Sequence, residues 1–369
     1  MSKKINLLLN AALKSSLTVF SILGLVMAGM YHSSCQITPQ GITIVGDNAA
    51  SPKITEVNTN DDFIEVLFSK RVQVEKAFAV EENAELTSIE NFLETDEKLS
   101  VLWSQNEEGT KLTFNTKEET KIGVHYQMFS CVKDENGNSL SFTIPFLGKN
   151  DHPAKVVLSE VNEAYSKNDG MTEFVELYVV EKGNLFGLEL YSASDKRSFE
   201  LPAAEVATGE YVIVHLRSPA DSNGAVSELD ADLSLSTALG AVRGARDIWM
   251  EGDQSALSST AEIIILSDKA HSKMIDCLMY CKQEYAEQNS DWKSESLKEA
   301  SALCVETGLW KGEGKPSDSV YSTKRKSISY ISRTNIADIK QDSELENSCS
   351  VWEGITKSRL TPGKPNEWM

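Results

Sequence analysis

Hydrolysis through a serine or cysteine nucleophile usually needs a histidine as base and a carboxylate to orient it, and this chain contains five histidines. They are scattered, at His32, His125, His152, His215 and His271. The Gly-x-Ser-x-Gly, P-loop and His-Glu-x-x-His motifs do not occur in the sequence. Paired carboxylates such as Asp61 and Asp62 are expected by chance in so acidic a chain. A triad assembled by the fold stays open, but the sequence favours a protein that is not an enzyme and has neither metal nor cofactor.

The amino terminus reads as an export signal. Three lysines, Lys3, Lys4 and Lys14, precede an apolar run from Leu17 to Met30, and polar residues follow the run. A membrane-spanning helix needs about 20 apolar residues, so this shorter run makes a permanent transmembrane segment the weaker interpretation. Residues 1–34 therefore predict a signal peptide.

Cys35 follows this signal directly, behind Ser33 and Ser34. The arrangement resembles a bacterial lipoprotein cleavage site, which implies that the Cys35 thiol receives a lipid and anchors the chain to a membrane. The usual motif has Leu three places before the cysteine, where this sequence has His32. The alternative is ordinary cleavage after Ala28, with Cys35 as a plain thiol. With Cys35 lipidated, residues 35–51 comprise the anchor cysteine and a flexible tether.

The five remaining cysteines are Cys131, Cys277, Cys281, Cys304 and Cys349. Cysteines of exported proteins are commonly oxidised. We expect a disulfide between Cys281 and Cys304, worth about 3 kcal/mol in the chain-entropy model, and a second between Cys277 and Cys349. Zinc bound by Cys277, Cys281 and Cys304 is a weaker alternative, because the short Cys-x-x-Cys spacing is missing.

Charge and length limit the classes of partner. The formal net charge is −19 over 369 residues, and the main basic cluster is Lys324-Arg325-Lys326. Such a surface repels phosphate backbones and anionic headgroups, so the sequence argues against nucleic-acid binding. A chain of this length with 41% hydrophobic residues is expected to form two domains.

From residue 52 the apolar pattern has a period of two. Ile64, Val66 and Phe68 alternate so that they share one face of a strand, and further strands are expected at residues 99–103, 111–114, 125–132 and 140–146. The segment 134–138, Asp-Glu-Asn-Gly-Asn, predicts a hairpin turn. It also matches the start of a calcium loop, but that pattern fails at Ser139 and Pro145. Short strands without intervening helices predict a β-sandwich.

Residues 52–148 resemble the bacterial Ig-like domains of the surface-layer type. The marks are the opening Pro52-Lys53-Ile54-Thr55-Glu56-Val57, the phrase Phe68-Ser69-Lys70-Arg71-Val72, and Tyr126 leading into Val132-Lys133-Asp134. After a linker at residues 148–153 the opening is repeated, since 156–162 echo 54–58 and 174–178 echo 63–67. Two copies of a first strand indicate two separate sandwiches.

The second segment, residues 153–369, resembles the lamin-tail domain, an Ig-like fold. The marks are residues 159–162, 173–178, 185–190 with its turn at Gly187, 209–214, 263–266 with 275–276, and the closing Thr361-Pro362-Gly363-Lys364-Pro365-Asn366. Val179 stands where the family usually has Asn. An insertion at about residues 282–310, with apolar residues loosely at helical spacing, predicts one or two short helices on the sandwich.

Together these patterns predict a mainly β protein of two tandem Ig-like sandwiches, exported and lipid-anchored in the cell membrane or outer membrane. Its expected role is a binding or scaffolding module for an unknown protein or glycan, with Trp249, Trp310, Trp352 and Trp368 as candidate contact or core residues. An accessory or hydrolytic envelope protein is the alternative, and a structural spacer is a third.

Overall fold

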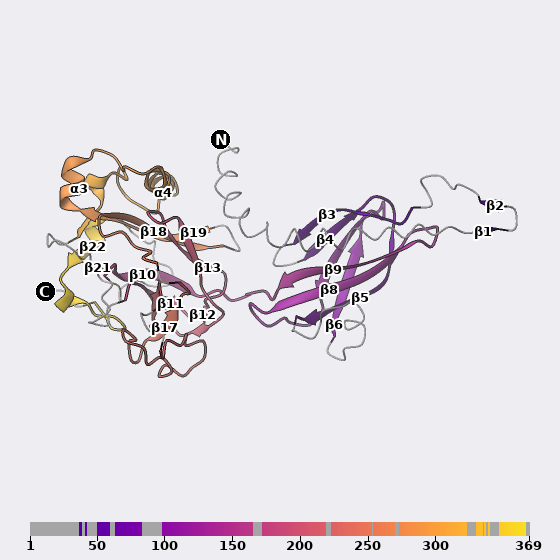
Figure 1. Cartoon of the computed structure of the whole chain (residues 1–369), viewed down its shortest axis with the longest axis horizontal. Coiled ribbons are helices and arrows are strands. Elements are labelled where there is room, and N and C mark those ends of the chain that lie inside the picture. Colours follow the sequence, from indigo (N-terminus) through magenta and orange to yellow (C-terminus); the bar gives the residue numbers. More distant parts are fainter. Residues whose placement is uncertain are drawn as a thin grey trace.

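The computed structural model describes residues 37–38, 41–42, 50–59, 63–82, 98–164, 172–218, 223–252, 254–269, 273–322, 330–334, 336, 339 and 347–366. Strands between residues 54 and 147 form one β unit and those between 155 and 355 form a second, with one linker between them (Figure 1). A two-residue pair, β1 (Ile37–Thr38) and β2 (Gly41–Ile42), precedes both. The predicted mainly β fold class is confirmed. Within the described part of the chain, no helix combines the length and apolar character needed to span a membrane.

The first unit has seven strands in the hydrogen-bonded order β3-β4-β7-β6-β5-β8-β9. They are β3 (Ile54–Thr59), β4 (Ile64–Phe68), β5 (Gln73–Glu81), β6 (Leu99–Gln105), β7 (Lys111–Thr116), β8 (His125–Lys133) and β9 (Ser139–Leu147). β5 and β6 share only two residue pairs, so the sheet folds over at this seam and encloses an apolar core. Ile64, Val66 and Phe68 are all buried in that core, as their alternation predicts.

The predicted turn at residues 134–138 joins β8 to β9. The Asp134 carboxylate accepts hydrogen bonds from the backbone N–H groups of Asn136 and Asn138, both at 2.9 Å. Gly137 has a φ of 83°, the left-handed conformation that glycine adopts without strain. The oxygen atoms of Asp134 are thus occupied in closing a hairpin.

The second unit consists of two sheets that pack around one core. The six-stranded sheet has the order β17-β16-β11-β10-β21-β22, with β10 (Lys155–Asn162), β11 (Phe174–Glu181), β16 (Tyr211–His215), β17 (Arg246–Trp249), β21 (Tyr330–Arg333) and β22 (Trp352–Ile355). The five-stranded sheet has the order β14-β13-β18-β19-β20, with β13 (Leu188–Ser192), β14 (Arg197–Glu200), β18 (Ala261–Asp268), β19 (Lys273–Lys282) and β20 (Val320–Ser322). Residues of both sheets, such as Leu158, Leu177, Ile263 and Leu278, are fully buried in the shared core. A small pair, β12 (Gly183–Asn184) and β15 (Glu205–Val206), lies beside them.

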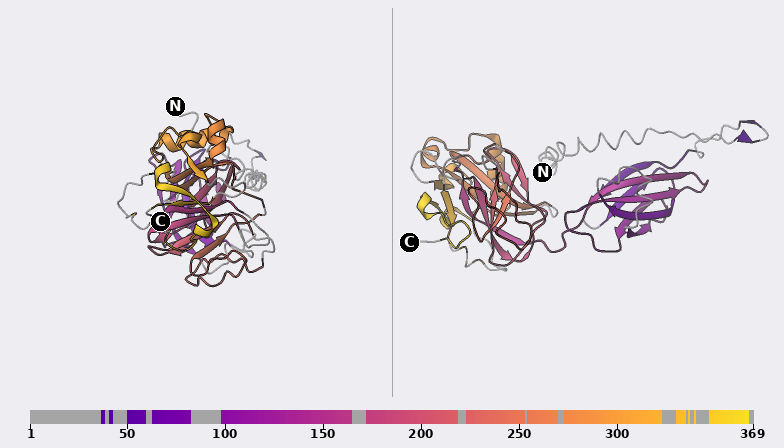
Figure 2. Two further views of the ribbon diagram at one scale, coloured as in Figure 1. Left: turned by 90° about the vertical axis from the view of Figure 1, so that its left-hand side faces the viewer. Right: turned by 60° about the horizontal axis from the view of Figure 1, so that its bottom comes forward.

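The predicted repeat of the opening strands is present. β10 pairs antiparallel with β11, as β3 pairs antiparallel with β4 in the first unit. The turn predicted at Gly187 precedes β13, and Gly187 has a φ of 91°. Both units therefore begin with the same two-stranded motif, and Figure 2 shows them from two further directions.

The predicted insertion forms two helices, α3 (Gln283–Gln288) and α4 (Glu295–Glu306), near β18 and β19 (Figure 1). Ser294 caps α4 by accepting a hydrogen bond from the Leu297 N–H at 3.3 Å. The buried face of α4 carries Leu297, Ala300 and Cys304, which join the core of the second unit. Among the described residues, short 3-10 helices lie at η2 (Pro316–Asp318), η4 (Cys349–Val351) and η5 (Lys357–Arg359).

The linker is hydrogen-bonded to both units. The Gly148 N–H donates to the Val124 carbonyl of the first unit at 2.8 Å. The Asn150 side-chain amide donates to the carbonyls of Asn184 and Phe186 in the second unit, at 3.1 and 2.8 Å. Gly148 and Asn150 are two residues apart in the sequence, so their contacts fix the two ends of the linker.

Candidate interaction site

The connection between β16 and β17 is the longest irregular segment of the second unit for which most residues are described. The two strands are parallel, so the chain must return along the whole sheet to begin β17. It does so outside β17, where the Glu228 N–H donates to the Asp247 carbonyl at 2.9 Å. We call residues 223–245 the crossover loop. By lying along β17 it covers an edge that would otherwise be open.

The inner side of the crossover loop is polar. The buried Glu228 carboxylate accepts hydrogen bonds from the backbone N–H groups of Ser236, at 3.1 Å, and Asp247, at 3.0 Å. The buried Arg246 guanidinium donates to the carbonyls of Glu228 and Asp230. Buried polar groups that find partners fix a loop firmly, because any other conformation would leave them unpaired.

A hydroxyl–imidazole–carboxylate chain lies at the base of the loop. Thr172 Oγ1 is 2.8 Å from His215 Nδ1, and His215 Nε2 is 2.6 Å from Asp247 Oδ1. The ring of Trp249 stacks on the His215 ring with centroids 3.7 Å apart. Burial lowers the pKa of His215, so the imidazole is neutral near pH 7. His215 is 0% exposed and Thr172 4%, so this chain ties the loop to the sheet and presents no surface to a substrate.

The outer side of the crossover loop exposes aliphatic side chains among polar ones. Four aliphatic side chains project into solvent with exposed fractions of 41 to 57%, namely Val226, Leu229, Leu235 and Leu239. A cavity of about 310 Å³ adjoins the loop, with Glu228 and Asp247 in its lining. The loop thus inverts the usual arrangement, with polar groups inside and aliphatic groups outside. Exposed aliphatic side chains on a rigid support are typical of protein interaction sites.

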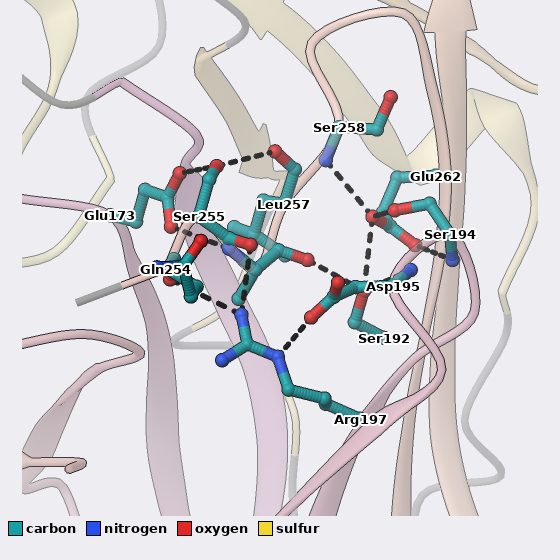
Figure 3. Close-up of polar contacts among 11 residues, drawn as sticks. Glu173, Ser192, Ser194, Asp195, Arg197, Gln254, Ser255, Leu257, Ser258 and Glu262 are labelled. Atoms are coloured by element: carbon teal, nitrogen blue, oxygen red, sulfur yellow. Dashed lines mark hydrogen bonds and ion pairs between the residues drawn. The ribbon is translucent and has the colours of Figure 1, made fainter. Parts of the chain in front are cut away.

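A second polar network holds the segment that follows β17 (Figure 3). The buried Glu262 carboxylate of β18 accepts hydrogen bonds, at 2.9 to 3.0 Å, from the backbone N–H groups of Ser194, Ser258 and Ile263. Glu173 accepts from the Ala256 N–H at 2.9 Å, and Arg197 donates to the Ser255 carbonyl at 2.8 Å. Figure 3 shows these carboxylates and the guanidinium directed at the backbone of residues 254–258. The carboxylate oxygens of Glu173 and Glu262 thus accept hydrogen bonds that hold this segment against the sandwich.

The first unit has a hollow of about 640 Å³ at the end that faces the linker. Core residues such as Phe114 and Met128 line it, and Leu102 and Leu147, 56% and 47% exposed, border it. His152 of the linker also borders it. The hydrogen bonds that His152 donates to Asp151 and to Glu205 of the second unit, at 2.7 and 3.0 Å, raise its pKa. The lining mixes apolar side chains with charges of both signs, so it favours no single class of ligand.

Comparison with known families gives one match over the second unit. The model described as "TP_1001_2nd: protein second domain" matches residues 154–353, which is more than half of the chain. The chain belongs to this family. An uncharacterized protein of Treponema pallidum (strain Nichols) is 29% identical over 199 residues, or 52% of this chain. The match covers 49% of that relative, so the chain spans about half the length of the curated protein it matches.

Solved structures show only distant likeness. The N-terminal part of the bacterial S-layer protein SbsC is 14% identical with a TM-score of 0.23, over 63% of this chain and 44% of that one. A DUF4876 family protein from Bacteroides thetaiotaomicron VPI-5482 is 9% identical with a TM-score of 0.31, over 79% of this chain and 94% of that one. Scores this low carry no conclusion about function.

The cysteines of the family-matched segment are free thiols, and the structure does not form the two disulfides expected from the sequence. The buried Cys304 of α4 is hydrogen-bonded to Cys277 of β19. Cys281 lies four residues further along β19, about 13 Å at the usual strand rise, and its Sγ is 3.1 Å from Ser319 Oγ. Cys349 is exposed, and Asn347 is the residue of that segment that contacts Cys277. Cys304 of the insertion thus lies next to Cys277, whereas the sequence led us to expect it next to Cys281.

The other predicted site residues have structural positions or lie outside the described residues. Trp310 and Trp352 are buried at 2% and 4% exposure, and Trp249 supports the crossover loop through His215. Cys35 and Trp368 fall outside the described residues. The aliphatic surface of the crossover loop was not predicted from the sequence. Its one signal was a run of leucines and valines among serines and aspartates that matches neither strand nor helix periodicity.

Proposed function

We propose that this protein is an exported, lipid-anchored cell-envelope protein that acts as a binding or scaffolding module, with the crossover loop as its partner-binding surface. The observation that carries the proposal is the inverted loop. Val226, Leu229, Leu235 and Leu239 are exposed although buried polar contacts fix the backbone that bears them. A fixed backbone loses little conformational entropy on binding, which favours affinity at an apolar surface.

The partner is a protein and not a glycan. Sugars are commonly recognised by stacking on aromatic rings, and the crossover loop contains no aromatic residue. Exposed Asp230 and Asp232 lie between the leucines, and the chain has a net charge of −19. Anionic lipid and nucleic acid are disfavoured for the same reason. The best fit is a protein surface with an apolar patch and basic residues around it.

Capture from envelope material tests this surface. We expect a crosslinked partner of the wild-type chain to be reduced at least about tenfold in the double variant Leu235→Asp with Leu239→Asp, because each charge would be buried in the interface. The matched control is Val57→Asp with Leu303→Asp, which alters apolar residues of similar exposure elsewhere. Equal capture by the loop variant and the control would contradict the role of the crossover loop.

Lipid anchoring rests on Cys35 and the preceding apolar run. Metabolic labelling with palmitate should label the wild-type protein and fail with Cys35→Ala, while the control Cys349→Ala, which removes an exposed thiol, stays labelled. An unlabelled wild-type protein would remove the anchor from the proposal. Proteolysis of intact cells would then distinguish a surface protein from a periplasmic one.

A binding role without catalysis is supported by the burial of the Thr172–His215–Asp247 chain. Purified protein should show no esterase or nuclease activity above that of the His215→Ala variant. Activity that disappears in this variant while the fold persists would instead support the hydrolytic alternative.

A further inference from the structure

The last described residues of the chain lie on the outer face of the six-stranded sheet. After β22, residues 360–366 cross this face, and we call them the C-terminal strap. Leu360 packs beside Tyr330 and Ile355, and the strap turns where the Lys364 N–H donates to the Thr361 carbonyl at 3.0 Å. A Pro-Gly pair with a positive φ at the glycine is the pattern of a type II turn, and Gly363 has a φ of 76°. The closing motif noted in the sequence therefore builds this turn.

Two buried glutamates hold the strap by its backbone. Glu160 of β10 accepts from the Thr361 N–H at 3.0 Å, and Glu176 of β11 accepts from the Gly363 N–H at 2.7 Å. Ser159 Oγ donates to the second oxygen of Glu176 at 2.7 Å. Both glutamates are 0% exposed. The strap is thus attached to the sheet through two carboxyl groups.

The two carboxyl groups face each other without a cation. Glu160 and Glu176 are register partners on adjacent antiparallel strands, a placement in which two like charges repel. Among the described ion pairs, none joins either glutamate to lysine, arginine or histidine. Two unpaired negative charges in one buried site are costly, and a bound proton removes that cost.

The other groups around the pair do not replace the proton. Ser332 of β21 donates to Glu160, and Tyr211 of β16, whose pKa burial raises, stays neutral. Arg333 of β21 offers the strap only its backbone carbonyl, which accepts from the Asn366 amide at 2.9 Å, while its guanidinium binds Asp276. On β22 and the segment after it, Glu353 is paired with Arg359. Lys357 and Lys364 are exposed.

We propose that the C-terminal strap is a proton-dependent latch, closed while Glu160 and Glu176 share at least one proton and released from the sheet when both are ionised. Burial raises the pKa of Glu160 to about 7, and burial together with Glu160 raises that of Glu176 well above its usual range. When the pKa of a carboxyl group is higher in the closed form than in the open form, the group stabilises the closed form. This stabilisation is complete at any pH below the pKa that the group has when exposed to solvent in the open form. The stabilisation is lost as the pH rises through the raised value. The latch is therefore tightest in acid and weakens toward and above neutral pH.

Hydrogen exchange of the intact protein, corrected for the intrinsic exchange rate at each pH, tests the latch. We expect the protection factor of residues 357–366 to fall at least about tenfold between about pH 5 and about pH 8 in the wild type. The double variant Glu160→Gln with Glu176→Gln keeps neutral side chains at every pH and should retain its protection. Glu353→Gln, which removes an exposed carboxyl next to the strap, is the control and should behave as wild type.

Protection of β19 measures the second unit as a whole and separates strap release from unfolding. We expect β19 to stay protected throughout in the wild type. A wild-type strap whose protection is independent of pH overturns the latch. So does a wild-type loss of protection shared by strap and β19. If the double glutamine variant does not fold, Glu160→Gln alone should shift the fall in strap protection to higher pH, and an unchanged profile overturns the proposal equally.

Discussion

The two units are both β-sandwiches, yet their interiors differ in kind. Among the described residues, the buried polar or charged side chains of the first unit are Ser130 and Asp134, whereas the second buries many, including Glu160, Glu176 and Asp276. Apolar burial alone can specify a fold, because the pattern of alternation decides which side faces inward. Buried polar groups add a further requirement, since each needs a particular partner. The fold of the first unit is therefore specified mainly by apolar alternation, and that of the second also by the hydrogen-bond and ion-pair partners of its buried polar groups.

The difference extends to what each unit can present to other molecules. The first unit fixes its β8–β9 turn mainly by local contacts, since Asp134 accepts from the N–H groups of Asn136 and Asn138, with Lys70 as a single distant partner at 3.3 Å. The second uses buried carboxylates to hold long irregular segments on its sheets, at the crossover loop and at the C-terminal strap. A segment held in this way can expose apolar side chains without collapsing onto the core. The polar interior of the second unit thus makes its proposed binding surface possible.

Breaking the central polar network should produce the largest effect. Arg333 donates to Asp276 at 2.9 Å and to the Asn347 side-chain carbonyl at 3.0 Å, with its guanidinium 4.6 Å from the ring centroid of Trp352. We expect Arg333→Ala to lower the free energy of unfolding of the second unit by about 3–5 kcal/mol, because Asp276 would remain buried without its cation. Urea unfolding measures this.

The control for this prediction lies in the first unit. Lys111 and Glu65 form a partly exposed pair at 2.8 Å, and Lys111→Ala should change stability by less than about 1 kcal/mol. If Arg333→Ala cost no more than Lys111→Ala, the second unit would not depend on its polar partners, and the contrast between the units would fail.

The first unit should instead be most sensitive to loss of apolar volume. Leu112 of β7 is 1% exposed within the core. Leu112→Ala should lower the free energy of unfolding of this unit by about 3 kcal/mol, through lost burial and the cavity left behind. The transition of the second unit in the same urea experiment is the internal control. An equal shift of both transitions would show that the two units unfold as one cooperative unit and do not have independent stabilities.

The strands were predictable from the sequence because their signal is local. The alternation along β4, the turn at Gly137 and the helical insertion each depend on residues within one short window. The polar networks were not predictable, because Asp276 and Arg333 are 57 residues apart and Glu160 and Thr361 are 201 apart. A sequence pattern shows that such residues are polar but not which of them meet across the fold.

The sequence also could not decide which of two residues on the same face of a strand contacts another element. Cys277 and Cys281 occupy equivalent positions on one strand, so the sequence could not tell which of them lies against α4. The crossover loop was missed for a different reason. Leucine is usually buried, and only the contacts of Glu228 and Arg246 show why these leucines are held outside.

A smaller effect is expected from a backbone change in the strap. Gly363 has a φ of 76°, and a Cβ there would lie 2.7 Å from the Ala245 Cβ and 2.9 Å from Val242 Cγ1. Gly363→Ala combines left-handed strain with a steric clash, so we expect a loss of about 2 kcal/mol in the second unit. Hydrogen exchange should show the loss first in the strap. Unchanged strap protection would mean that the close approach to the crossover loop does not hold the strap in place.

The smallest effect is expected at the matching glycine of the first unit. Gly137 has a φ of 83°, but a Cβ there would meet no atom within 4 Å. Gly137→Ala should therefore cost only the backbone strain, about 1 kcal/mol, measured on the first urea transition. The difference between the two glycine variants isolates the packing of the strap against the crossover loop, because the strain is similar in both. If Gly363→Ala and Gly137→Ala lowered the free energy of unfolding equally, the packing of the strap against the crossover loop would contribute nothing. The second unit would then differ from the first only in its buried polar contacts.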